Sequence, residues 1–341
     1  MNESELLPNR WLVTGGCGFI GKALIKFLLE HHPNYKIRVL DNLSVGRRED
    51  LANFCKYSEV GAMQIETNFK EDKCEPVELM VGDIQSYSSC LSSCEEMDVV
   101  VHLAANTGVG PSVDDPRSDM LTNVVGTFNM LEAARQKDVK RFVFASSGAP
   151  AGIVTPPIHE EIAPHPVSPY GASKLAGEGY CSAYYQTFAL ETVALRFGNV
   201  YGPGSVHKSS VVAKFIKQAL NGEKLEIYGD GSQTRDFIHI DDLIRAIVLS
   251  SVTYGIGGEI FQIATGRETT VGELADMLIE ALSHRGCAAV KAIHTSPRKG
   301  DVERNYADIS KAATMLKWVP ELTIEKGIAQ TIDAFMREDA K

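Results

Sequence analysis

Tyr170 and Lys174 are the residues whose types and spacing most directly suggest chemistry in this chain. They lie four residues apart in the stretch SPYGASKLAGEGY, so on a helix their side chains share one face. Ser168 and Pro169, directly before them, are typical of a helix start. A phenol has a reference pKa of about 10 and acts as a base near neutrality only when a nearby positive charge favours the phenolate. Lys174 can supply that charge.

A hydroxyl group joins this pair from the stretch FVFASSGAP, which has the pattern of a buried strand ending at Ser146 and Ser147. Residues at the carboxyl ends of parallel strands lie in the crevice where ligands bind. A serine there can hydrogen-bond the same substrate oxygen as Tyr170. The sequence therefore predicts an acid–base centre made of Tyr170, Lys174 and a hydroxyl from Ser146 or Ser147.

Glycines at 15, 16, 18 and 21 lie between an apolar run and an amphipathic segment in RWLVTGGCGFIGKALIKFLLE. The spacing Gly15-x-x-Gly18-x-x-Gly21, or Gly16-x-Gly18-x-x-Gly21, between a strand and a helix is that of a dinucleotide-binding loop. Glycine permits the tight turn and lets the backbone approach a pyrophosphate, toward which the helix N-terminus directs its free N–H groups.

Asp41 ends the next predicted strand, 20 residues after Gly21. A carboxylate in that position accepts hydrogen bonds from ribose hydroxyls and repels a 2′-phosphate, which favours NAD over NADP. Arg47 and Arg48 leave NADP open as the alternative.

Apolar runs alternate with helical patterns through the first half of the chain. Near-continuous apolar strands separated by helices indicate a parallel sheet covered on both faces. The predicted helices include Phe19–His31 and Leu121–Lys137, and residues 50–78 are expected to form an irregular surface excursion. The candidate strands are Trp11–Thr14, Ile37–Asp41, Leu79–Gly82, Val99–Leu103, Arg141–Ser146 and Thr192–Arg196.

Beyond the stretch NVYGPG (199–204) the pattern changes to short strands and helices broken by Gly and Pro. We therefore expect an α/β protein with a Rossmann-type doubly wound parallel sheet over residues 1–196, to which 236–264 return. A smaller mixed α/β substrate-binding lobe is expected over 197–341.

Composition narrows the functional class. The chain has 341 residues and a formal net charge of −10, which argues against nucleic acid as a partner because phosphate neutralisation needs clustered Lys and Arg. No apolar run reaches the roughly 18 residues of a membrane span, and MNESELLPNR lacks the features of a signal peptide, so we expect a cytoplasmic protein without a membrane partner. The seven cysteines are expected to be free thiols, and Cys90 and Cys94 lack a second ligand pair, so no metal is predicted.

A longer set of motifs adds a resemblance. TGGCGFIG, DNLSVG, GDI, VHLAA, NVVGT, SS and SPYGASK resemble the extended short-chain dehydrogenase/reductase family. Within it, LRFGNVYGPG, LEIYGDGSQTRDFIHIDDL and RKGDVERNYADISKA extend the similarity to NAD-dependent nucleotide-sugar epimerases and dehydratases, above all enzymes such as UDP-glucose 4-epimerase.

The resemblance implies roles for particular positions, with Ser147, Tyr170 and Lys174 as the catalytic group. The residues implied to bind NAD, besides Tyr170 and Lys174, are Gly15, Gly18, Phe19, Ile20, Gly21, Asp41, Asn42, Ser44, Gly46, Asp83, Ile84, Leu103, Ala104, Ala105 and Asn123. Those implied to bind a UDP-sugar are Ser147, Asn199, Tyr228, Arg235, Arg298 and Asp301. Guanidinium groups suit a diphosphate because they form forked, charge-assisted hydrogen bonds.

The implied reaction is 4-epimerisation of a UDP-hexose through a transient 4-keto sugar. Related dehydratases and decarboxylases carry acidic residues directly after the catalytic Ser or Thr, where this chain has Gly148 and Ala149. Dehydratase, decarboxylase and, in a different class, a non-catalytic NAD-binding sensor remain the alternatives. The family also implies a homodimer formed through the helices following Asp114 and Tyr170.

The chain departs from the family pattern near the sugar. Pro150 and Ala151 replace the usual aromatic after the serine, and Thr107 stands where some 4-epimerases have Lys. Asn305 has intermediate bulk at a position whose size governs acceptance of N-acetylated sugars, so UDP-glucose/galactose and the N-acetyl pair both remain open. His102 and His239 follow strand patterns and are expected to be packed core residues without a chemical role.

Overall fold

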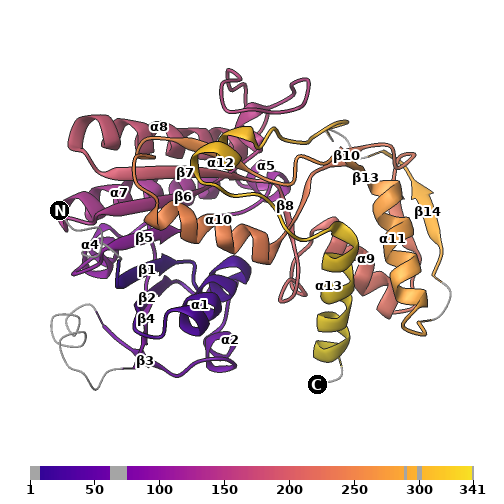
Figure 1. Cartoon of the computed structure of the whole chain (residues 1–341), viewed down its shortest axis with the longest axis horizontal. Coiled ribbons are helices and arrows are strands. Elements are labelled where there is room, and N and C mark those ends of the chain that lie inside the picture. Colours follow the sequence, from indigo (N-terminus) through magenta and orange to yellow (C-terminus); the bar gives the residue numbers. More distant parts are fainter. Residues whose placement is uncertain (1–7, 62–74, 288–289, 298–301, 340–341) are drawn as a thin grey trace. The chain divides into compact units, whose positions relative to one another are not determined.

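The computed structural model describes residues 8–61, 75–287, 290–297 and 302–339 (Figure 1). Contacts divide the chain into two compact units. Unit 1 comprises Met1–Gly152, Ala163–Arg196 and Ala246–Phe261, and unit 2 comprises Ile153–Ile162, Phe197–Arg245 and Gln262–Lys341. The assignment of one predicted domain to the cofactor and the other to the substrate stays a prediction.

The central element of unit 1 is an eight-stranded sheet in the order β12-β7-β6-β5-β1-β2-β4-β3. β1 pairs in parallel with both β2 and β5, so the chain reverses its direction of winding at β1. Helices lie on both faces (Figure 1), which confirms the predicted Rossmann-type α/β fold. The strands are β1 (Arg10–Thr14), β2 (Lys36–Asp41), β3 (Tyr57–Glu59), β4 (Val77–Val81), β5 (Val99–His102), β6 (Arg141–Ser147), β7 (Glu191–Phe197) and β12 (Ile260–Ile263).

In unit 1 the helix α1 and the start of the helix α8 agree with the sequence prediction, whereas two other segments differ from it. The predicted helix Leu121–Lys137 is divided into a π-helical turn, η3, and the α-helix α7. Within the predicted excursion, α2 and β3 are regular elements, and β3 pairs with β4. These elements are α1 (Phe19–His31), α2 (Arg48–Ala52), α4 (Tyr87–Ser93), α5 (Val109–Asp114), α6 (Pro116–Met120), η3 (Leu121–Val125), α7 (Gly126–Gln136), η4 (Ala149–Ala151) and α8 (Pro169–Phe188).

Unit 2 is a mixed α/β body with a core of its own. Phe215, Leu278 and Phe335 are buried there together with the apolar faces of three helices. Its elements are β8 (Asn199–Tyr201), α9 (Val211–Leu220), β9 (Leu225–Tyr228), β10 (Thr234–Arg235), β11 (Phe237–His239), β13 (Thr269–Thr270), α11 (Val271–Ser283), β14 (Ala292–Thr295), α12 (Ser310–Met315) and α13 (Ile324–Asp339), with α10 (Ile240–Val252) continuing into unit 1.

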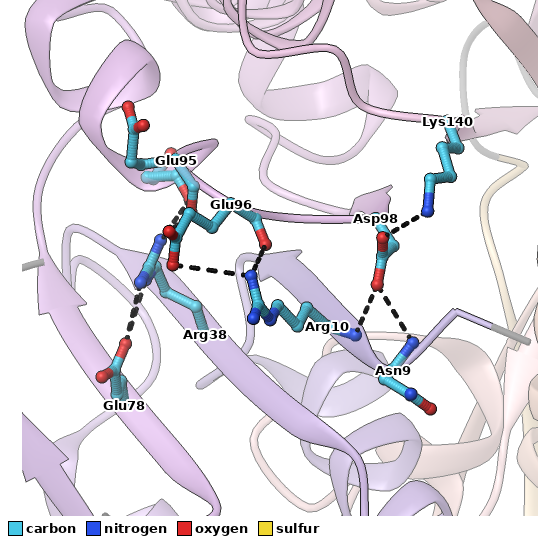
Figure 2. A network of polar contacts seen from close by, with 9 residues as sticks. Asn9, Arg10, Arg38, Glu78, Glu95, Glu96, Asp98 and Lys140 are labelled. Carbon is cyan, nitrogen blue, oxygen red and sulfur yellow. Dashed lines mark hydrogen bonds and ion pairs between the residues drawn. The ribbon is translucent and has the colours of Figure 1, made fainter. Parts of the chain in front are cut away.

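A buried ion pair joins neighbouring strands of the unit 1 sheet. Arg38 on β2 donates to Glu78 on β4 at 3.1 Å, and both side chains are fully buried (Figure 2). Arg38 also donates to the carbonyls of Ser93 and Glu95 near the end of α4, at 3.1 and 2.8 Å. Burial lowers the pKa of Arg38 and raises that of Glu78, because it disfavours both charges more than their attraction supports them. The pair therefore depends on both partners being present.

Replacing one partner is expected to destabilise unit 1 more than replacing both. Glu78→Leu leaves a buried guanidinium without its carboxylate and should lower the free energy of unfolding by about 3–5 kcal/mol. The double variant Arg38→Met/Glu78→Leu should lose less. Urea denaturation measures both, with Glu59→Gln in the half-exposed Arg48–Glu59 pair as a control expected to change stability by less than about 1 kcal/mol. A double variant less stable than Glu78→Leu would contradict this account.

Candidate active site

The first turn of α8 holds Tyr170 in place. Ser168 caps the helix by accepting a hydrogen bond from Gly171 N at 3.1 Å, and Pro169 occupies the first turn, as the sequence indicates. The backbone N–H of Tyr170 donates to Ser112 Oγ on α5 at 3.1 Å. Two neighbouring elements thus set the position of the phenol-bearing residue.

The phenol of Tyr170 and the hydroxyl of Ser147 are hydrogen-bonded to each other. Burial raises the pKa of Tyr170, while the bond to Ser147 opposes the rise. As a base near neutrality, Tyr170 therefore needs an additional positive charge nearby.

Lys174 lies one turn further along α8 and is almost completely buried. Its Nζ donates to Ala145 O on β6 at 2.8 Å and lies 5.0 Å from the ring centroid of Phe144 and 5.9 Å from that of Tyr170. Burial lowers the pKa of Lys174 to about 8, against the charge of Asp119, which raises it. The structure thus brings Ser147, Tyr170 and Lys174 together.

The two serines at the end of β6 have different partners. Ser146 Oγ donates to Glu178 Oε1 at 2.5 Å, and Arg196 donates to both oxygens of Glu178 at 2.8 Å. Ser147 is the serine that meets Tyr170, because successive side chains of a strand point to opposite faces. The sequence analysis missed Glu178, although its position four residues after Lys174 places it on the same helix face.

The glycine loop is packed too tightly for side chains. Gly15 has φ +67°, and a Cβ there would lie 2.9 Å from Ala104 N. A Cβ at Gly21 would lie 2.5 Å from Gly15 O, and one at Gly46 would overlap the backbone of Cys17. Gly18 precedes α1 as its N-cap residue, so the N–H groups of Phe19 and Ile20 in the first turn have no acceptor within the helix.

Asp41 at the end of β2 holds this loop against the next one. Its Oδ2 accepts from Cys17 N at 2.9 Å and its Oδ1 from Leu43 N at 2.8 Å. A carboxylate offers about four lone-pair sites, so both oxygens keep capacity for ribose hydroxyls. Asn42 accepts from Ser44 N at 3.0 Å and donates to Asp83 Oδ2 at 2.9 Å, which brings three more predicted residues together.

A chain of buried hydrogen bonds, called the relay below, fixes the backbone conformation where β5 ends. Thr14 Oγ1 accepts from Leu103 N and Ala104 N at 3.2 and 3.1 Å, so its own proton points to His102 Nδ1 at 2.8 Å. His102 Nε2 then donates to Thr127 Oγ1 at 3.1 Å. Burial lowers the pKa of His102 to about 3, so the ring is neutral and structural. The relay holds the predicted segment Leu103–Ala105 beside Gly15.

The other predicted residues of unit 1 line the same end of the sheet. Ile84, after β4, is buried and its carbonyl accepts from Asn129 Nδ2 at 3.0 Å. Asn123 in η3 is buried and holds Asn106 through both backbone groups, at 2.8 and 2.9 Å. π-helical turns are frequent at functional sites.

Unit 2 contains a cavity of about 270 Å³ that brings Asn199, Tyr228 and Arg235 together. Arg235 donates to the carbonyls of Thr234 and Val302, both at 2.7 Å, which fixes its guanidinium in place. Three charged or amide side chains of the lining were not predicted to bind a ligand. Lys214 lies outside the quoted motifs, whereas Glu226 and Gln233 lie within LEIYGDGSQTRDFIHIDDL.

Lys214 places a positive charge beside the aromatic ring of the cavity. Its Nζ lies 4.6 Å from the ring centroid of Tyr228 and donates to the Tyr228 hydroxyl at 3.3 Å and to Glu226 at 2.8 Å. Gln233 Nε2 donates to Tyr228 O at 2.8 Å. Contacts to its hydroxyl and to its backbone carbonyl thus fix the position of Tyr228.

Two predicted positions lie outside the described residues, Arg298 and Asp301. His239 is buried in unit 2, its Nδ1 accepts from Asp241 N at 3.3 Å, and its ring meets Tyr201 edge-on. Cys90 and Cys94 are buried, and burial raises the pKa of the Cys90 thiol to about 12. No helix in the described part of the chain is long and apolar enough to cross a membrane.

Comparison with known proteins assigns the family. The model of the NAD dependent epimerase/dehydratase family matches residues 11–264. The chain belongs to this family. A UDP-glucose 4-epimerase from Mycolicibacterium smegmatis is 36% identical over 330 residues, covering 96% of this chain and 98% of the relative. A dTDP-glucose 4,6-dehydratase from Streptomyces antibioticus is 33% identical over 330 residues, covering 94% and 91%.

A solved structure shows the same fold. The UDP-glucose 4-epimerase of Thermotoga maritima with UDP-glucose superposes with a TM-score of 0.83 at 33% identity, covering 97% of this chain and the whole of that chain. The resemblance to NAD-dependent nucleotide-sugar epimerases and dehydratases is thereby confirmed, and NAD is the cofactor of the family.

The residues of unit 1 fit a bound NAD. A Cβ at Gly15 would meet the backbone of Ala104 and one at Gly21 the backbone of Gly15 and Gly16, so glycine is needed for the tight turn, and the first turn of α1 leaves N–H groups for a pyrophosphate. Asp41 supplies spare acceptor capacity at the end of β2, where the adenosine ribose of a dinucleotide lies in this fold.

Gly15→Ala tests this fit. We expect NAD affinity to fall at least about tenfold, because the left-handed backbone costs an L-residue about 1–2 kcal/mol and the new Cβ meets Ala104. Calorimetric titration of cofactor-free protein with NAD measures it. Gly179→Ala on α8, where a Cβ meets nothing within 4 Å, is the matched control and should bind normally. Unchanged affinity in Gly15→Ala would contradict the assigned cradle.

Proposed function

We propose that this chain interconverts two UDP-hexoses that differ in configuration at carbon 4, through a transient 4-keto sugar and with NAD retained between turnovers. The observation that carries the proposal is the cluster of Ser147, Tyr170 and Lys174 in unit 1, with no acid following the serine. Tyr170 is hydrogen-bonded to Ser147 and lies beside a buried ammonium. Gly148 and Ala149 stand where an acid would be needed to expel water.

Tyr170 accepts and returns the proton in this reaction. Its phenolate accepts the proton of the sugar 4-hydroxyl during oxidation and returns it during reduction. Ser147 donates a hydrogen bond to the same sugar oxygen, and the ammonium of Lys174, 5.9 Å from the ring centroid of Tyr170, favours the phenolate. Bound NAD supplies reversible hydride acceptance. The other residues of the site position the reacting atoms.

The loops at the end of the sheet bind the cofactor in this proposal. The glycine loop and the first turn of α1 hold the pyrophosphate, while Asp41 and Asn42 bind the adenosine ribose. Asp41 carries a negative charge and thereby selects NAD over NADP. Asp83 and Ile84 flank the adenine, Leu103–Ala105 the central part, and Asn123 the nicotinamide half.

The cavity of unit 2 binds the nucleotide of the substrate in this proposal. Arg235 and Asn199 contact the diphosphate, and the ring of Tyr228 stacks on the uracil. Arg298 and Asp301 would add contacts to the diphosphate and its ribose. The sugar pair stays open between the plain and N-acetylated hexoses.

The remaining predictions concern assembly and location. A homodimer formed through the helices following Asp114 and Tyr170 is supported by Phe128, Tyr180 and Phe188, which are partly exposed and contact one another or Tyr184 on α7 and α8. A cytoplasmic location is likewise a proposal.

Tyr170→Phe tests the reaction. We expect kcat to fall by about 10²–10⁴ because the proton acceptor is lost, while NAD content stays that of the unmodified protein. NMR of a panel of UDP-sugars follows the products, which should keep their mass and invert at carbon 4. Loss of water or carbon dioxide would show a dehydratase or decarboxylase instead. If no UDP-sugar is converted by the unmodified protein, the sensor alternative holds.

Tyr228→Ala tests the nucleotide cavity. Loss of stacking should raise KM for the UDP-sugar about tenfold, because base stacking on an aromatic ring is worth about 1–3 kcal/mol. NAD binding should stay normal, since that cradle belongs to unit 1. Tyr254→Ala removes an exposed tyrosine of unit 1 and serves as the control. An unchanged KM in Tyr228→Ala would contradict the proposal that the uracil binds in this cavity.

A further inference from the structure

Asp119 is a buried carboxylate close to the catalytic group that no motif indicated. It lies on α6 and is 1% exposed. Its Oδ1 accepts from Asn123 Nδ2 at 2.9 Å. Its Oδ2 has no hydrogen-bond partner among the described residues. A buried carboxylate oxygen without such a partner needs an explanation, because desolvating a charge is costly.

Hydrogen bonds lead from Asp119 to the backbone of Tyr170. Asn123 Nδ2 is also 3.1 Å from Ser173 Oγ, which in turn donates to Tyr170 O at 3.0 Å. Asn123 Nδ2 also donates to Asn106 O at 2.9 Å, and Asn123 Oδ1 accepts from Asn106 N at 2.8 Å. Asp119 therefore helps to orient the amide that supports the first turn of α8.

Lys174 needs a compensating negative charge, because its Nζ donates to the uncharged carbonyl of Ala145. The ionisable groups that interact with it come from three elements: Asp119 on α6, His102 on β5, and Tyr170, Glu178 and Cys181 on α8.

Four of these groups cannot compensate the ammonium well. Burial lowers the pKa of His102 to about 3 and raises those of Cys181 and Tyr170, so all three are neutral near pH 7 in this structure. Glu178 is held by Arg196, which donates to both of its oxygens. Asp119 is the carboxylate whose charge remains for Lys174.

We propose that Asp119 is a positioning residue of the catalytic centre, whose buried charge keeps Lys174 protonated and whose Oδ1 orients Asn123 behind Tyr170. It touches neither substrate nor cofactor in this role. The proposal rests on the proposed function for the roles of Tyr170 and Lys174, but the charge relation can be measured without substrate.

The charge of Asp119 acts in the same direction on both catalytic groups. It raises the pKa of Lys174 and that of Tyr170. Asp119→Asn should therefore lower both, whereas a defect of packing alone would reduce the rate without moving either. This shared direction is the signature to be measured.

The first measurement is the ¹⁵N titration of Lys174 Nζ in cofactor-free protein, with Lys174→Met used for assignment. Asp119→Asn should shift the midpoint about one pH unit lower, as expected for removal of a nearby opposite charge. Asp114→Asn, an exposed acid five residues earlier, should leave it unchanged. An unchanged midpoint in Asp119→Asn would overturn the proposal whatever the substrate is.

The second measurement is the pH profile of kcat for the epimerisation. Both limbs should move to lower pH in Asp119→Asn, since the acid limb reports the base and the alkaline limb the protonated lysine. Asp119→Glu retains the charge and should restore the positions of the limbs. A lower kcat with unmoved limbs, or limbs that shift equally in Asp119→Glu, would overturn the proposal.

If Asp119→Asn does not fold, the unmodified protein gives a separate test. With ¹³C-labelled aspartate, the Nζ shift of Lys174 should show a second inflection at the pH where Asp119 takes up its proton, because coupled groups titrate together. A single inflection over that range would overturn the proposal.

Discussion

The need to keep a lysine charged inside a dry part of the protein governs the arrangement around the active site. Lys174 is almost completely buried beside Tyr170, and burial lowers its pKa to about 8 even though the charges of Asp119 and Glu178 oppose the shift. A carbonyl, an aromatic face and acidic groups surround it in compensation. Glu178 is satisfied by Arg196 and Asp119 by Asn123, so the negative charges are themselves held at fixed positions. The rigidity of this part of unit 1 follows from that set of buried polar contacts.

Much of the fold could be predicted because the signals are local. Apolar runs such as β1 and β5 are buried on both faces, which is why they lack alternation. The bounds of α1 follow from the glycine that precedes it and the amphipathic pattern that follows. The chemical triad was equally accessible, since Tyr170 and Lys174 share a helix face and Ser147 ends a strand.

The supporting residues were not accessible in the same way. Thr14 and Thr127 meet His102 across long stretches of sequence, and no local pattern distinguishes such a relay from ordinary packed threonines. The π-helical turn at Leu121–Val125 has no sequence signature in an otherwise regular helical pattern. Arg38 and Glu78 lie in strands that read as apolar, and their pairing depends on the register of β2 against β4.

The proposed division of tasks, with the cofactor in unit 1 and the nucleotide sugar in unit 2, accounts for why the cofactor is easier to derive from the sequence than the sugar. The cradle of unit 1 demands glycine at positions where a Cβ would meet backbone, so steric necessity leaves a trace in the sequence. The cavity of unit 2 relies on side chains such as Lys214 and Gln233, whose types are common on any surface and carry no spacing rule. A binding loop that requires glycine at fixed positions can be predicted from the sequence. Selectivity that depends on polar side chains is recognised only once the fold places those side chains around one cavity.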